Sequence, residues 1–313
     1  MVEAFKRPLA AADIKSRAKA LGADLVGIAD GERIDTSAIT RLDGERVIVL
    51  ARRLNDGVAR IRRWNDRHKY YNDELALTHL EETSLELVYW LEDCGYPALI
   101  VPPTHVDPSQ YQDDPQAHLE PMLSLPHAAV EAGLGTLGLN LQLLTPEYGP
   151  RVVLTAVLCS VDVECDQPQS AALCQGPACG RCLKACPADA VHEWARDWPA
   201  CDRYRSPHGF AQLSEHLEKI IEETDAAARK QLLRSEASFD LWQSILRGSG
   251  VITGCRRCAD VCPVGADYAA MLADAHAEIA ESTPDKEKRL AAMRGASAAY
   301  EKHKHFIGFL KQV

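Results

Sequence analysis

The first 160 residues alternate between helical and extended hydrophobic patterns. Apolar positions at helical spacing run from Leu9 to Leu21, where Gly22 is placed to end the helix, and a short apolar run, Asp24–Ala29, follows. Arg46–Ala51 is rich in Val and Ile and is bounded by polar residues, as a buried strand would be. The pattern therefore predicts helices and strands in alternation, with a second helix over Asn72–Cys94 and a strand over Tyr96–Val101.

Two further segments interrupt this regular pattern. His105–Pro126 contains four prolines and is predicted to be irregular, as site-forming loops often are. Next we expect a short helix over Pro126–Ala132, three glycines within six residues, a turn at Thr145–Gly149 and a strand over Arg151–Leu158. The glycines fit G-x-G-x-x-G but follow a helix instead of a strand, so a dinucleotide-binding Rossmann fold is not predicted.

Composition and charge narrow the class of protein. The chain has 313 residues, roughly two domains' worth, of which 46% are hydrophobic and 26% charged, as in ordinary globular proteins. No stretch approaches the roughly 20 apolar residues that span a bilayer, and the N-terminus has no signal-peptide pattern, so we expect a cytoplasmic protein without a membrane partner. The net charge of −10 disfavours a large nucleic-acid footprint. The basic stretch from Arg52 to Lys69 is interpreted as a solvated face or as an anion-binding edge.

The cysteines are the strongest chemical signal. Ten of eleven lie between Cys159 and Cys262, and the two blocks CxxxxCxxCxxxCP and CxxCxxxCP carry seven of them. Such triplets that end in Cys-Pro are typical of bacterial two-cluster ferredoxins, in which the cysteine before proline binds the other cluster. This cross-over predicts two [4Fe–4S] clusters. One is held by Cys174, Cys179, Cys182 and Cys262, and the other by Cys186, Cys201, Cys255 and Cys258.

Some alternatives stay open at this point. Structural zinc also uses C-x2-C pairs, but it rarely uses a triplet that ends in Cys-Pro, and here that ending occurs twice. Cys165 or Cys159 could replace Cys174 as a ligand, whereas Cys94 is interpreted as a buried core thiol. Two clusters indicate either an electron carrier or an enzyme that passes electrons to another centre. The 160 residues ahead of the cysteines favour the enzyme.

Several motifs together resemble the cobalamin-dependent iron–sulfur reductases, which comprise epoxyqueuosine reductases and reductive dehalogenases. These motifs are HAAVEAGLG from His127, GLN from Gly138, TPEYGPR from Thr145 and the two cysteine blocks with Cys201 between them. The resemblance implies an α+β fold. A nitroreductase-like, corrinoid-binding domain (1–165) would precede a ferredoxin-like domain (166–270, with a helical insert at about 210–246) and a helical tail (271–313). It also implies a bound cobalamin, with contacts from Gly138, Asn140, Leu143, Leu154, Val157 and Arg203.

The resemblance does not identify the substrate or the residue that donates a proton to it. Epoxyqueuosine reductases carry an aspartate acid where this chain has Leu119, so the neighbouring Glu120 is the first candidate for the proton donor and Tyr111 the second. The chain lacks the longer C-terminal repeats that grip tRNA in that group, and its net charge is acidic. We therefore do not expect tRNA to be a partner. We expect a small-molecule substrate and an electron donor such as flavodoxin or ferredoxin, with a ferredoxin-type carrier as the alternative function.

Overall fold

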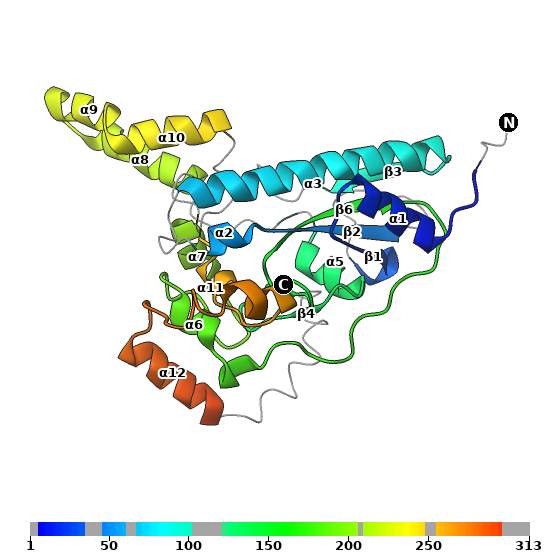
Figure 1. The fold of residues 1–313 in the computed structure, drawn as a ribbon. Helices are drawn as coiled ribbons and strands as arrows, with labels where there is room; N and C mark the ends of the chain where they lie inside the picture. Colours follow the sequence, from blue (N-terminus) through cyan, green and yellow to red (C-terminus); the bar gives the residue numbers. More distant parts are fainter. Residues whose placement is uncertain are drawn as a thin grey trace.

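The computed structural model describes residues 6–34, 46–60, 67–101, 121, 123–205, 209–247 and 255–295. Its centre is a four-stranded sheet in the order β1-β2-β6-β3, in which every neighbouring pair is antiparallel (Figure 1). The strands are β1 (Leu25–Asp30), β2 (Arg46–Arg53), β3 (Ala98–Val101) and β6 (Val152–Cys159).

Alternation along β6 explains why helices cover both faces of the sheet. Val157 and Cys159 join the hydrophobic core formed with α1 (Ala11–Leu21) and α3 (Arg67–Asp93). Ala156 and Leu158 point the other way, into a second core with α5 (Leu125–Glu131). Because successive side chains of a strand face opposite sides, one sheet builds both cores. The polar Thr155 is accommodated because its hydroxyl lies 2.7 Å from the hydroxyl of Ser84 on α3.

The cysteine-bearing part of the chain lies beside one end of this sheet (Figure 1). Its elements are short: η2 (Gly176–Ala178), α6 (Arg181–Ala185), α7 (Trp198–Arg205), α11 (Arg257–Asp260), the π-helical turn η3 (Tyr268–Leu272) and α12 (Pro284–Gly295). Their hydrophobic core is small, with Leu183, Cys186, Ala190 and Val191 at its centre. A core of this size indicates that other interactions must hold the region in place.

The helical insert forms an arm that projects from the body (Figure 1). It consists of α8 (Phe210–Glu222), α9 (Ala226–Leu233) and α10 (Glu236–Arg247). The remaining elements are the short helices η1 (Gly31–Arg33) and α2 (Asp56–Ala59) and a two-stranded hairpin, β4 (Thr136–Leu137) with β5 (Leu143–Leu144). None of the described helices combines the length and the apolarity needed to cross a membrane.

The predicted helices and strands that fall on described residues agree with these elements within a few residues, whereas most of the predicted irregular segment His105–Pro126 and the end of the predicted tail lie outside the described residues. The largest difference is α3, which begins at Arg67, ahead of the predicted Asn72, because its first turns contact the second cysteine block through charged side chains that carry no hydrophobic signal. The insert predicted at about 210–246 is observed as three helices. The mixed α/β fold is confirmed, whereas the nitroreductase-like and ferredoxin-like architecture stays a prediction.

Candidate functional site

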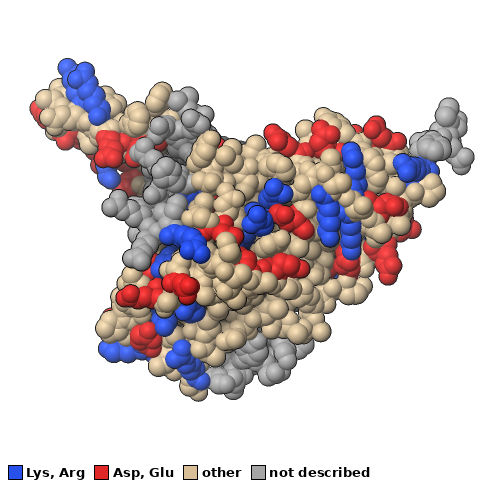
Figure 2. All heavy atoms as spheres, viewed as in Figure 1, with Lys and Arg blue, Asp and Glu red and all other residues tan. Residues whose placement is uncertain are grey.

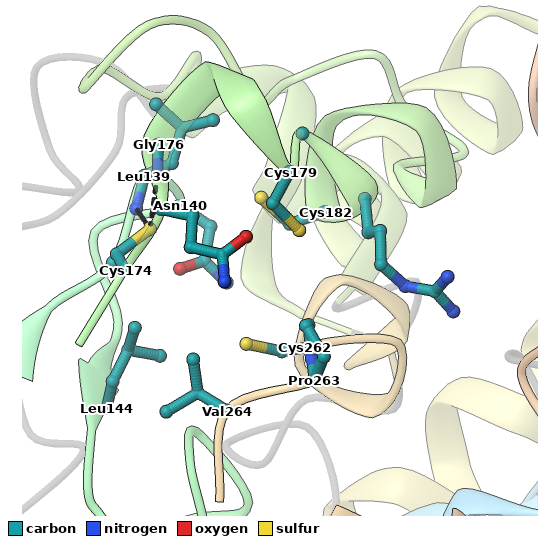
Figure 3. Close-up of a pocket in the computed structure, with 14 residues that line it drawn as sticks. Leu139, Asn140, Leu144, Cys174, Gly176, Cys179, Cys182, Cys262, Pro263 and Val264 are labelled. Carbon is teal, nitrogen blue, oxygen red and sulfur yellow. Dashed lines mark hydrogen bonds between the residues drawn. The ribbon is translucent and has the colours of Figure 1, made fainter. Parts of the chain in front are cut away.

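Four cysteines from both blocks surround one cavity. Its lining includes Cys174, Cys179, Cys182 and Cys262, the set that the cross-over pattern grouped together. Figure 3 shows their side chains around a common space, with Asn140 also reaching into it. The cavity encloses about 110 Å³, well above the roughly 10–15 Å³ that one water molecule needs. Cys159 and Cys165, the alternatives to Cys174, do not line it.

Backbone amides point at the sulfur of Cys174. The amide N–H groups of Leu139 and Gly176 both donate to its Sγ, each at 3.3 Å (Figure 3). Hydrogen bonds to the charged form of a group favour that form, so these donors suit a metal-bound thiolate. Gly180 lines the same cavity and allows Leu290 to pack closely against the backbone there. Its φ is +59°, and a Cβ on this residue would lie 2.3 Å from the Leu290 side chain.

The other four predicted ligands also gather. Cys186, Cys201 and Cys258 lie in the small core of this region. Cys255 interacts electrostatically with all three. The sulfur of Cys186 accepts a hydrogen bond of 3.2 Å from the amide of Ala190. Cys182 interacts electrostatically with Cys258 as well as with the cysteines of its own cavity, so the two groups are neighbours.

Burial makes these thiols hard to ionise without a cation. Desolvation raises the pKa of Cys201 to about 11, and it raises the pKa of both Cys255 and Cys262 to about 12. Only the thiolate binds metal, and a bound cation deprotonates a coordinating thiol outright. The donor set therefore fits a thiolate-bound metal centre.

The cavity differs from a single-ion site. Among the described residues, no three His, Cys, Asp or Glu side chains are arranged to hold one metal ion. A single zinc ion would need its ligands about 2.3 Å from one point, close enough to form such a group. A cluster of several irons would hold its thiolates further apart than a single ion does.

Arg151 connects the sheet to the second cysteine block. It stands just before β6 with its side chain only 2% exposed, and it pairs with Asp267 through hydrogen bonds of 2.7 and 2.6 Å. Its remaining N–H groups donate to three backbone carbonyls of the block, those of Ala259, Cys262 and Val264. One guanidinium thus fixes the loop that carries Cys262.

The turn before Arg151 is shaped for the same contact. The amides of Ala266 and Asp267 donate to the carbonyls of Pro146 and Glu147, each at 3.1 Å. A Cβ on Gly149 would lie 2.0 Å from the Val264 carbonyl, and φ at Gly149 is +53°. Only glycine suits this close approach. In the described structure the TPEYGPR segment, which the resemblance associates with the corrinoid, packs on the cysteine loop.

Buried charges join α3 to α11. Lys69 and Asp260, both 0% exposed, are 2.8 Å apart. Arg256 pairs with Asp73 at 2.8 Å and with Asp260 at 3.0 Å. Burial raises the pKa of Asp73 to about 6, against the lowering effect of Arg256. In the basic stretch that begins at Arg52, Lys69 is therefore part of an internal network instead of a solvated face or an anion site.

The residues predicted to contact cobalamin fall into four environments. Gly138 and Asn140 line the cysteine cavity, and Leu143 is buried in the core beside α5, with Leu154 packed against that core. Val157 is fully buried in the core on the other face of the sheet. Arg203 is exposed on α7. The structure does not bring these six together around one described cavity. Glu120 and Tyr111 lie outside the described residues.

Sequence reasoning missed the roles of three side chains at this site, those of Gln142, Arg196 and Arg151, although Arg151 ends the TPEYGPR motif. Gln142 Oε1 lies 3.7 Å from Cys258 Sγ, and Arg196 donates to the carbonyl of Asn140. For Gln142 the sequence offered only its position shortly after the glycine segment, and for Arg196 only its position shortly after the first cysteine block. Such positions in the sequence do not distinguish these residues from surface residues.

The chain has relatives among known proteins. No family model matches it. It is 31% identical over 252 residues to an epoxyqueuosine reductase of Gloeobacter violaceus, and the alignment covers 66% of this chain and 70% of that protein. It is 29% identical over 136 residues to an epoxyqueuosine reductase of Synechocystis sp., which covers 43% of this chain and 37% of that one.

Solved structures give weaker similarities. A catabolic reductive dehalogenase superposes with a TM-score of 0.49 at 16% identity, covering 79% of this chain and 37% of that chain. The epoxyqueuosine reductase from Streptococcus thermophilus has a TM-score of 0.45 at 17% identity, covering 81% and 65%. A third structure, an epoxyqueuosine reductase with an epoxyqueuosine-modified tRNA stem loop, has a TM-score of 0.40 at 18% identity, covering 59% and 53%.

The sequence relationship defines the class of protein. The chain is a reductase, so the enzyme interpretation holds over the alternative of an electron carrier. It belongs to the epoxyqueuosine reductase family, because it covers more than two-thirds of the Gloeobacter relative at over 30% identity.

One expectation about partners is wrong. We did not expect tRNA, yet the relatives are epoxyqueuosine reductases and one such enzyme is seen with a modified tRNA stem loop. The expectation rested on C-terminal length and on net charge. Net charge averages over the whole chain, whereas binding depends on the local distribution of charge.

The Arg151 contacts give a first prediction. Arg151→Met should lower the free energy of unfolding by about 3 kcal/mol, because it leaves the partly buried Asp267 carboxylate without its partner. Denaturant unfolding of anaerobically purified protein measures this. The double variant Arg151→Met/Asp267→Asn is the control and should recover part of the loss. An unchanged unfolding midpoint in the single variant would show that the contact does not hold the loop.

Proposed function

We propose that this chain is a cobalamin-dependent iron–sulfur reductase with two [4Fe–4S] clusters. The observation that carries the proposal is the convergence of Cys174, Cys179 and Cys182 with Cys262 around one cavity. These residues come from two distant blocks, and their grouping follows the cross-over of two-cluster ferredoxins. The proposed domains are 1–165 for the corrinoid, 166–270 for the clusters and 271–313 for the tail.

The protein would hold the second cluster with Cys186, Cys201, Cys255 and Cys258. Backbone amides next to Cys174 and Cys186 would donate to the sulfurs. The cobalamin would contact Gly138, Asn140, Leu143, Leu154, Val157 and Arg203. When bound, the clusters would supply single electrons and the low-valent cobalt would supply the reducing power.

The proposed substrate is epoxyqueuosine in tRNA. It follows from the family and from the tRNA stem loop seen with a related enzyme. Reductive cleavage of a C–O bond leaves a basic oxygen or carbon that needs a proton. The chain would supply it from a carboxyl that desolvation keeps protonated, for which Glu120 is the first candidate, or from the phenol of Tyr111.

Iron content tests the clusters. Anaerobically purified protein should contain about eight irons per chain, as expected for two four-iron clusters. Cys258→Ser should remove one cluster and bring the iron content to about half. Cys165→Ser is the matched control, since this cysteine lies outside both groups, and it should keep the full content. Stoichiometric zinc without visible absorption would contradict the proposal.

A second test concerns the cofactor and the substrate. The reconstituted protein should bind about one cobalamin per chain and, with a chemical reductant, convert epoxyqueuosine in a tRNA stem loop to the reduced nucleoside, as mass spectrometry would detect. The same stem loop without the modification is the control. Cobalamin binding without conversion would reject this substrate but keep the cofactor, and an absence of cobalamin binding would reject the reductase mechanism.

The proton donor gives a third test. Glu120→Gln should keep both clusters while lowering turnover by about 10²-fold or more, the usual effect of losing a positioned acid. Tyr111→Phe is measured in parallel under single-turnover conditions. Full activity of Glu120→Gln together with loss of activity in Tyr111→Phe would transfer the role to Tyr111.

A further inference from the structure

One short turn touches both groups of cysteines. It runs from Gly138 to Gln142, between β4 and β5. The amide of Leu139 donates to Cys174 of the first group, and the side chain of Gln142 lies 3.7 Å from Cys258 of the second. A Cβ on Gly138 would lie 2.7 Å from the side-chain oxygen of Asn140, so glycine allows the turn to fold this tightly.

The side-chain oxygen of Gln142 lies at the second group. Nδ2 of Asn140 donates to Oε1 of Gln142 at 2.7 Å. An iron-bound Cys258 would be a thiolate, which accepts hydrogen bonds and donates none. In the structure the Cys258 thiol donates to Oε1 of Gln142, so an iron-bound Cys258 requires the Gln142 amide to turn and present its Nε2–H group to the sulfur in place of Oε1.

Arg196 adds a positive charge at the same place. Its guanidinium donates to the carbonyl of Asn140 and lies 4.7 Å from the centre of the Trp198 ring. It interacts electrostatically with both Cys201 and Cys258. Its Nε is buried and has no hydrogen-bond partner among the described residues. A buried N–H without a partner, on a guanidinium that acts electrostatically on two thiols, is a donor suited to a sulfur ligand.

We infer that Arg196 and Gln142 are positioning residues that raise the reduction potential of the cluster held by Cys186, Cys201, Cys255 and Cys258. Reduction adds one electron to that cluster. A nearby cation and N–H donors to its sulfurs favour the more negative, reduced state. This inference rests on the proposed two-cluster function and adds to it which side chains control electron uptake at the second cluster.

The test is an EPR-monitored redox titration of the holoprotein and its variants. The signal missing in Cys258→Ser identifies the second cluster. In Arg196→Gln the reduced-to-oxidised ratio of that cluster at a fixed potential should fall about tenfold, which is 59 mV for a one-electron couple. Gln142→Leu should shift the ratio in the same direction by a smaller factor. The first cluster should keep its potential in both variants.

Two further variants separate charge from structure. Arg196→Lys keeps the positive charge and should restore most of the potential. Arg229→Gln removes a charge from α9 on the projecting arm and should leave both clusters unchanged.

If Arg196→Gln keeps about eight irons and both potentials match those of the unmodified protein, the inference is wrong. If Arg196→Gln loses iron, a shifted potential in Gln142→Leu supports the inference and an unshifted one contradicts it. A wild-type protein with fewer than two clusters would instead contradict the proposed function.

Discussion

The buried guanidinium of Arg151 is the contact on which the site depends. A charge taken out of water is costly unless it is paired and its other donors are satisfied, and Arg151 meets both conditions with Asp267 and three carbonyls. These partners lie in the second cysteine block or in the few residues after it, whereas Arg151 itself directly precedes the central strand β6. The packed sheet therefore determines where Cys262 lies. It also fixes the position of the cysteine-bearing region, which has only a small hydrophobic core of its own.

The same logic recurs around the other cysteine loops. Lys286 donates to the carbonyl of Cys186, and Arg181 donates to the carbonyl of Val261. Both side chains are cations, and both bind backbone oxygens at the C-terminal ends of short helices, where several carbonyls have no partner within the helix. Eight cluster-bound thiolates, as proposed, would concentrate negative charge in a small volume, and the cations that hold the loops would also oppose that charge. Structural support and electrostatic compensation come from the same side chains.

The sequence predicted the fold where one periodic pattern decided the outcome. The strands near Val47 and Val157 and the long helix through Leu87 followed from hydrophobic spacing, and the grouping of Cys174 with Cys262 followed from a spacer rule. Arg151, Gln142 and Arg196 could not be predicted in the same way. Their roles depend on contacts between segments far apart in the sequence. The sequence around a polar residue does not show whether its partner in the folded protein is water or a buried carbonyl.

The charge count misled us about tRNA for a related physical reason. The net charge of −10 is a sum that records nothing about position: an ion pair such as Lys69 with Asp260 adds zero to it and, being completely buried, presents nothing to a ligand. On the face shown in Figure 2, basic and acidic side chains are intermixed over the body of the molecule. A polyanion responds to the charges within about a Debye length, roughly 10 Å at 0.1 M salt, and not to the sum over the chain. A local cluster of cations can thus bind tRNA on an acidic protein, and only the exposed cations near the substrate determine the affinity.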